Sequence, residues 1–136
     1  MPQTIHVFSG YFSSMKEATS YSEQQWEEPA PDETWTEEAY TEWENRNPTW
    51  ALDDDLGVDY MNSDFIETIR GDDRLDYLKT QITDNNARSN LLEMISNKDN
   101  TLVLIMSTAF DGQQVSLSPT SKLNYHGEYK WNVAVL

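Results

Sequence analysis

The chain has 136 residues and no cysteine, which excludes disulfide bonds, cysteine-bearing zinc sites and thiol catalysis. Its 24 acids and nine bases give a formal net charge of −15, which disfavours direct binding to nucleic acid or to anionic membranes. No apolar run approaches the roughly 18 residues of a membrane span, and the N-terminus lacks the pattern of a secretory signal. We therefore expect one cytoplasmic domain whose partner has a basic surface.

The negative charge is concentrated between Glu17 and Asp76. This stretch contains 19 of the 24 acids but only three bases, so it carries −16, while the rest of the chain carries +1. It also contains four of the five tryptophans. Large rings interleaved with acids are typical of a protein-binding face, because charge speeds encounter and desolvated rings slow dissociation.

The N-terminal residues predict a strand followed by a helix. Residues 4–12 are largely apolar on both alternating faces, which favours an interior strand. Ser14 and Glu17 have the spacing of a capping box, so we expect a helix from Met15 to about Gln25.

A second helix is expected after the prolines at positions 29 and 31, which predict a loop. Over residues 33–45, helical periodicity places Trp35 and Trp43 on one arc, which we interpret as facing the core. The opposite arc is acidic and is expected to face solvent or a partner; it consists of Glu37, Glu38, Glu42 and Glu44.

Residues 49–64 are too acidic and irregular to predict a regular element. The run Asp53 to Asp55 suggests a calcium loop, but an EF-hand requires glycine at its sixth position. Counting from Asp53, that position is Val58, so we expect no calcium site.

The second half of the chain predicts two helices between two strands. A short strand is expected over residues 65–69, then helices from Asp72 or Asp73 to Ile82 and from about 86 to 95. Residues 101–106 are continuously apolar, which predicts the central strand of a sheet.

The C-terminal region predicts further strands. Residues 115–117 are expected to pair back as a hairpin after the Asp111-Gly112 turn, and a last strand is expected from Leu123 onward with a turn or bulge at His126-Gly127. The fold class is therefore α+β: a single domain, mainly an antiparallel sheet of about four or five strands with helices packed on it.

Common catalytic signatures are absent from the sequence. It contains no phosphate-binding loop, dinucleotide fingerprint, nucleophile elbow or zincin motif. His6 and His126 lie in strand-like contexts and are expected to be structural. We expect no enzymatic activity, no cofactor and no metal, although a pair of carboxylates could perform acid–base chemistry and this alternative stays open.

Several sequence blocks resemble family 22 of the bacterial immunity proteins from polymorphic toxin systems. The blocks are HVFSGYF at 6–12 with the capping box at 14–17, DLGVDY at 55–60 with DFIE at 64–67, and KLNYHGEY at 122–129. The resemblance implies a cytoplasmic protein that binds and neutralises a co-encoded toxin. Residues 27–50 depart from it, being acidic and rich in tryptophan, and are interpreted as an insertion for partner-specific contact.

The leading hypothesis is a stoichiometric inhibitor that covers the active site of a basic toxin, expected to be a nuclease, with an acidic face. Trp50 is expected either as an exposed anchor or as part of the core. An acidic adaptor or DNA mimic acting on a host protein is the alternative. The candidate partner-binding residues are Glu37, Glu38, Glu42, Trp50, Asp53, Asp54, Asp55 and Asp59.

Overall fold

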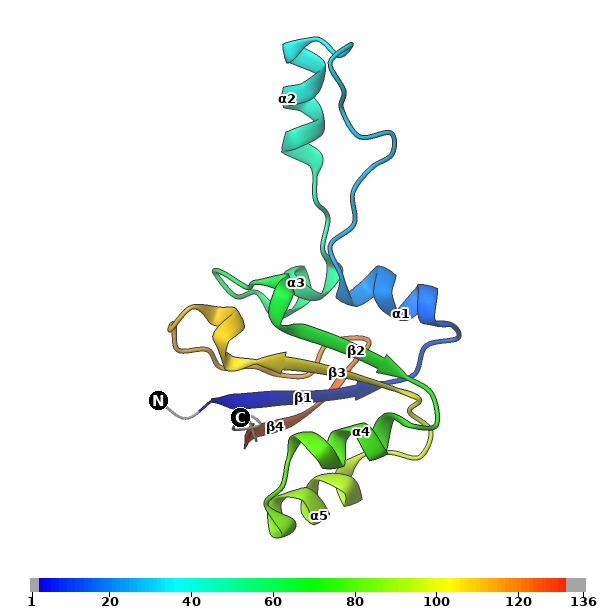
Figure 1. Ribbon diagram of the computed structural model, residues 1–136, viewed down its shortest axis with the longest axis vertical. Helices are drawn as coiled ribbons and strands as arrows, with labels where there is room; N and C mark the ends of the chain where they lie inside the picture. Colours follow the sequence, from blue (N-terminus) through cyan, green and yellow to red (C-terminus); the bar gives the residue numbers. More distant parts are fainter. Residues whose placement is uncertain (1–2, 132–136) are drawn as a thin grey trace.

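The computed structural model describes residues 3–131 of the chain. Its strands form one four-stranded antiparallel sheet in the spatial order β2-β3-β1-β4, which confirms the predicted α+β class. The two strands predicted to be interior occupy the two central positions (Figure 1). The strands are β1 (Thr4–Gly10), β2 (Ile66–Arg70), β3 (Thr101–Met106) and β4 (Asn124–Lys130).

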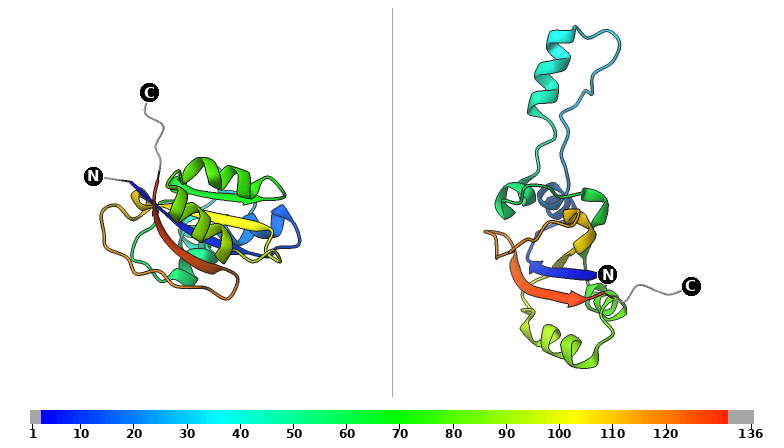
Figure 2. Two further views of the ribbon diagram at one scale, coloured as in Figure 1. Left: turned by 90° about the horizontal axis from the view of Figure 1, so that it is seen from below. Right: turned by 90° about the vertical axis from the view of Figure 1, so that its left-hand side faces the viewer.

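Helices cover both faces of the sheet (Figures 1 and 2). Helices α1 (Met15–Ser22) and α3 (Ala51–Leu56) lie on one face, and α4 (Arg74–Gln81) and α5 (Asn85–Met94) lie on the other. Helix α2 (Glu37–Arg46) stands away from both layers. Within residues 3–131, no helix is both long enough and apolar enough to cross a membrane. Two short 3-10 helices complete the set, η1 (Ser63–Phe65) and η2 (Ser107–Phe110).

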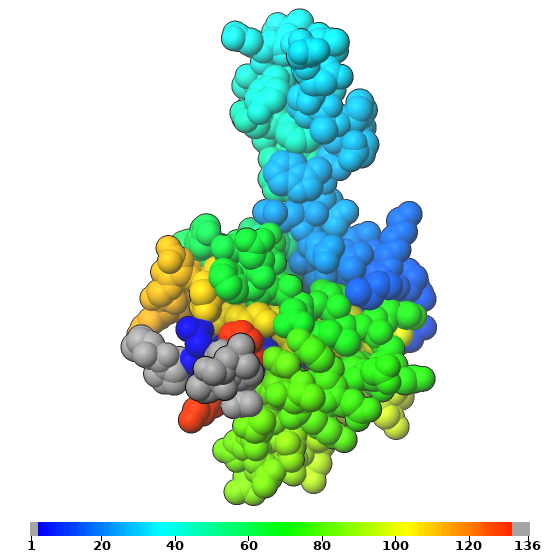
Figure 3. Space-filling view, viewed as in Figure 1, coloured from blue at the N-terminus to red at the C-terminus, as the bar shows by residue number. Residues whose placement is uncertain are grey.

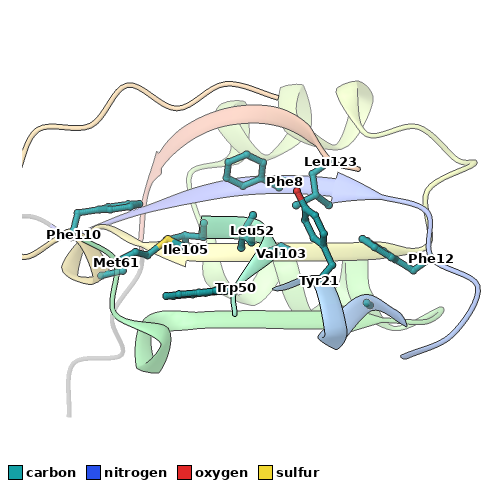
Figure 4. Close-up of a cluster of buried hydrophobic side chains, with 12 residues drawn as sticks. Phe8, Phe12, Tyr21, Trp50, Leu52, Met61, Val103, Ile105, Phe110 and Leu123 are labelled. Carbon is teal, nitrogen blue, oxygen red and sulfur yellow. The ribbon is translucent and has the colours of Figure 1, made fainter. Parts of the chain in front are cut away.

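The alternation of side chains along β3 builds two hydrophobic clusters. Val103 and Ile105 contribute to the cluster beneath α1 and α3, part of which Figure 4 shows. Leu102 and Leu104 contribute to the cluster beneath α4 and α5. Every residue of β3 is buried, as expected for a strand that is covered on both faces.

Helix α1 begins as its capping box predicts and ends earlier than expected. The Ser14 hydroxyl accepts a hydrogen bond from the backbone N–H of Glu17 (3.0 Å), while the Glu17 carboxylate accepts one from Ser13. The helix ends at Ser22 rather than near Gln25, because Gln25 pairs through its backbone with Thr49.

Both histidines have structural contacts. His6, only 4% exposed, is hydrogen-bonded through Nδ1 to the Tyr125 hydroxyl (2.9 Å). His126 Nε2 lies 2.7 Å from the hydroxyl of Ser9, which donates a hydrogen bond to Asp99 (2.6 Å). Burial lowers the pKa of both imidazoles and so favours their neutral forms.

The irregularity predicted in the last strand is present. The pairing register between β1 and β4 shifts opposite His126-Gly127, and Gly127 has a φ of 105°, which favours glycine. The predicted extension of this strand to the end of the chain includes Val133 and Val135, which lie outside the described residues.

The predicted hairpin strand over residues 115–117 is wrong, because this segment has no regular structure. Strand β3 is already paired with β1 on one side and β2 on the other, so a returning strand has no free edge beside it. Val115 and Leu117 are partly buried against the cluster beneath α1 and α3, which explains their alternating apolar pattern.

Candidate functional site

Residues 26–48, which we call the arm, project from the body and contain α2 (Figures 1 and 3). The two ends of the arm meet where the backbone N–H of Gln25 bonds the Thr49 carbonyl (2.8 Å) and the N–H of Thr49 bonds the Gln25 carbonyl (2.9 Å). No residue of α2, which lies entirely within the described part of the chain, is buried. The arm therefore offers its surface to solvent on several sides.

The prediction that Trp35 and Trp43 enter the protein core is wrong. Both rings are partly buried, but they lie in the arm, away from the layers around the sheet. The Trp43 ring stacks on Trp26 with centroids 5.7 Å apart and planes at 23°, and its Nε1 donates to the Glu27 carbonyl (3.1 Å). Helical periodicity correctly indicated that one face of α2 packs, but the packing partner is the arm's own returning chain.

An ion pair and hydrogen bonds to Glu27 stabilise the base of the arm. Arg46 forms an ion pair with Glu27, with Nε and Oε2 2.9 Å apart. Asn47 donates from Nδ2 to the same carboxylate (3.1 Å) and accepts at Oδ1 from the Glu27 backbone (2.8 Å). The hydrogen bond from Arg46 is the main cause that lowers the pKa of Glu27, so this carboxylate stays ionised.

The arm concentrates negative charge on a small projecting surface. It contains eight acids and one base, Arg46, so its formal charge is −7. The predicted residues Glu37, Glu38 and Glu42 are all exposed on α2. Glu37 and Glu38 lie in the first helical turn, where acids are favoured by the unpaired backbone N–H groups.

A second acidic surface lies where the arm joins the body. This hollow of about 390 Å³, which we call the basal hollow, is lined by the neck residues Pro48 and Thr49, by Gln24 after the end of α1 and by the segment around α3. Three predicted acids and two rings face it. They are Asp53, Asp54, Asp59, Trp50 and Tyr60.

Helix α3 explains how the aspartate run is arranged, and sequence analysis missed this helix. Its six residues are followed by Gly57, whose φ of 65° is the left-handed conformation that glycine adopts easily. The helix places Asp53 and Asp54 on the wall of the hollow. Partial burial, and secondarily the charge of Asp54, raises the pKa of Asp53.

Two of the predicted contact residues are engaged with the body. Trp50 is 7% exposed and donates from Nε1 to the Ser22 carbonyl (2.8 Å), so it occupies the core (Figure 4). Its predicted alternative role as an exposed anchor is wrong, because the ring is packed in the cluster beneath α1 and α3. Asp55 is exposed, but its carboxylate accepts a hydrogen bond from the Tyr21 hydroxyl (2.6 Å).

The exposed rings are ones that sequence analysis did not select. Trp26 and Tyr40 of the arm are 52% and 46% exposed, and Tyr60 at the basal hollow is 50% exposed. Tyr60 directly follows Asp59 in an acidic segment. Its position there is the sequence feature that could have identified Tyr60 as a candidate contact residue. Tyr40 falls on the same helical arc as Trp43, so periodicity alone could not separate an exposed ring from a packed one.

The arm and the basal hollow present carboxylates and exposed aromatic rings to solvent. No group of three or more histidine, aspartate or glutamate side chains within residues 3–131 is arranged to hold a metal ion. Comparisons with protein-family models, with curated proteins and with solved structures give no match. The features that bear on function are therefore the charge, shape and exposed rings of the arm and the basal hollow.

Proposed function

We propose that this protein is a cytoplasmic immunity protein that binds a cognate bacterial toxin stoichiometrically and neutralises it. The observation that carries the proposal is the projecting arm of charge −7, which has two exposed rings and an acid-lined hollow at its base. A toxin with a basic active-site groove, such as a nuclease, would be complementary to this surface in charge.

The two parts of the site suit successive stages of binding. Exposed carboxylates on the arm attract a basic partner over roughly 8 Å at physiological ionic strength. Such steering raises the association rate more than the final affinity. Trp26, Tyr40 and Tyr60 provide apolar area that a partner can desolvate, which would slow dissociation.

The resemblance to immunity proteins supports the same function. Its first and last blocks overlap most of β1 and β4, which pair with each other in the sheet. The block at 55–60 runs from the end of α3 to Tyr60 beside the basal hollow. The blocks that carry the resemblance thus belong mainly to the body, while residues 27–50, interpreted as an insertion, correspond closely to the arm.

Co-expression with the product of the neighbouring gene tests the proposal. Cells that produce the neighbouring protein alone should stop growing, and this chain should restore growth and co-purify with that protein in a 1:1 complex. A matched culture should carry a variant in which Glu37, Glu38 and Glu42 are all glutamine, and its rescue should be weaker. If the chain neither restores growth nor co-purifies, the proposed function is wrong.

A further inference from the structure

A second hollow lies on the arm itself, separate from the basal hollow. It is an open depression of about 430 Å³, and we call it the arm pocket. Two aromatic residues, Trp35 and Tyr40, and two threonines form part of its wall. Three carboxylates complete the lining, those of Asp32, Glu37 and Glu44.

The backbone brings these groups together from two segments. Glu37, Tyr40 and Glu44 are three and then four residues apart on α2, so they share one face of the helix. Asp32 and Trp35 come from the turn before it, where the Trp35 N–H bonds the Asp32 carbonyl (3.2 Å). The Asp32 carboxylate accepts from the Thr34 N–H (2.8 Å), and the hydrogen bonds from Thr34 lower the pKa of Asp32.

The arm cannot fill this pocket with its own cation. Arg46 is the only basic residue between positions 26 and 48, and its guanidinium pairs with Glu27 at the base of the arm. Neither Trp35 nor Tyr40 takes part in an aromatic pair among the described residues. The pocket therefore offers rings and carboxylates to a group from another molecule.

The combination of rings and acids selects among ligands. An anion would be repelled by the three carboxylates. A purely apolar group would displace water from these carboxylates without replacing its hydrogen bonds. A guanidinium is planar and weakly hydrated, so it can stack on an aromatic ring while its N–H groups bond carboxylates. A lysine ammonium is a compact and strongly hydrated charge, so it would gain less from stacking.

We propose that the arm pocket receives the side chain of an arginine presented by the protein partner. The identity of that partner as a toxin rests on the proposed function, whereas the capture of an arginine does not. The arm would then contribute one specific anchoring contact in addition to its diffuse charge. An arginine near the mouth of the toxin's active site would be held by Glu37 and Glu44 against the rings.

Titration of the isotopically labelled full chain with N-acetyl-arginine amide, followed by NMR at constant ionic strength, tests the pocket. The Trp35 indole signal and the Tyr40 amide signal should shift with saturation, and N-acetyl-lysine amide should bind more weakly. The double substitution Glu37→Gln and Glu44→Gln should weaken arginine binding about fivefold, since each exposed ion pair contributes modestly. Tyr40→Leu should weaken it about threefold by removing a cation–π partner.

The control variant carries Glu38→Gln and Glu42→Gln, which removes the same two charges from the same helix but from residues outside the pocket lining. It should bind arginine amide with nearly the parent affinity. Backbone chemical shifts should show that α2 stays helical in every variant. Equal weakening by both double variants, or shifts that spread over the acidic surface without saturation, would overturn the proposal. Because the probe is a single amino-acid derivative, this result is independent of whether the chain rescues cells from a toxin.

Discussion

The hydroxyl of Tyr77 on α4 donates a hydrogen bond to the carboxylate of Glu67 on β2. Burial, the hydrogen bond to Glu67 and the negative charge of Glu67 together raise the pKa of Tyr77 from 10.0 to about 12. All three effects disfavour the tyrosinate in the folded state. This contact therefore links the packing of α4 on the sheet to pH.

Stability should fall at alkaline pH because of this tyrosine. The contribution of the Tyr77 hydroxyl to the free energy of unfolding is fully present below the unfolded pKa of 10.0. It is lost as the pH rises toward about 12, where the hydroxyl ionises in the folded protein. After allowance for solvent screening at this half-buried position, we expect a loss on the order of 1 kcal/mol. Urea unfolding at pH 8, 10 and 11 measures it.

Tyr77→Phe is the matched control because it keeps the ring and removes the ionisable hydroxyl. Its free energy of unfolding should decline less steeply above pH 10 than that of the parent chain. Parallel declines in the two proteins would mean that another group causes the alkaline loss, for example Tyr21, whose pKa is also raised by burial.

At individual positions, the sequence predicted roles that depend on neighbouring residues better than it predicted whether a side chain is buried. It identified the cap at Ser14 and the structural histidines, since these depend on local spacing or on neighbouring strand residues. It assigned Trp35 to the core and left Trp50 open between the core and an exposed position, because a ring beside acids is compatible with either. Only the three-dimensional path of the chain places Trp50 under α1 and Trp35 on the arm.

At the scale of the elements, the arm that contains α2 is held together by contacts within itself. The backbone pair between Gln25 and Thr49 closes it at the neck, and the Trp26–Trp43 stack and the Glu27–Arg46 ion pair stabilise it internally. No residue of α2, within the described chain, enters the core clusters. The body should therefore fold without it.

Replacing residues 26–48 with the two-residue turn Asn-Gly should leave the body intact. Gln25 and Thr49 already pair as neighbours on antiparallel segments, which such a turn can join. We expect a cooperative thermal transition with Tm within about 5 °C of the parent value, because the buried apolar surface is unchanged. Circular dichroism measures this, and loss of the transition would show that the body depends on the arm.

Element prediction succeeded where apolar periodicity was strong. The continuous apolar run of β3 and the spaced leucines of α4 and α5 identified those elements, because their burial controls their sequence pattern. Helix α3 was missed because only Leu52 among its residues is fully buried and three of the other five are aspartates. The strand expected at 115–117 failed because the positions beside β3 were already occupied.

At the scale of the whole molecule, charge is distributed unevenly in space. The arm carries −7 of the total −15 at the end farthest from α5. The sequence predicted this imbalance through its distribution of charges and the α+β class through the order of its expected elements. It could not predict that the acidic segment projects as an arm, since a projecting helix and a packed one can share the same apolar spacing.

Association with the proposed toxin partner should depend strongly on salt. We expect the association rate to fall about tenfold or more between 10 mM and 150 mM NaCl, because the Debye length shortens from about 30 Å to 8 Å. Stopped-flow measurement gives this rate, and the variant that lacks the arm should show both a slower rate and a shallower dependence. A rate that does not change with salt would contradict electrostatic steering by the arm.

The closed neck also has an evolutionary consequence. Since Gln25 and Thr49 meet independently of what lies between them, substitutions on α2 escape the packing constraints that act on the strands. A lineage could alter the arm's rings, acids or length while the sheet and its two helical layers stay the same. Divergence between related chains should therefore be fastest in residues 26–48, and exchange of this segment should transfer partner choice from one chain to another.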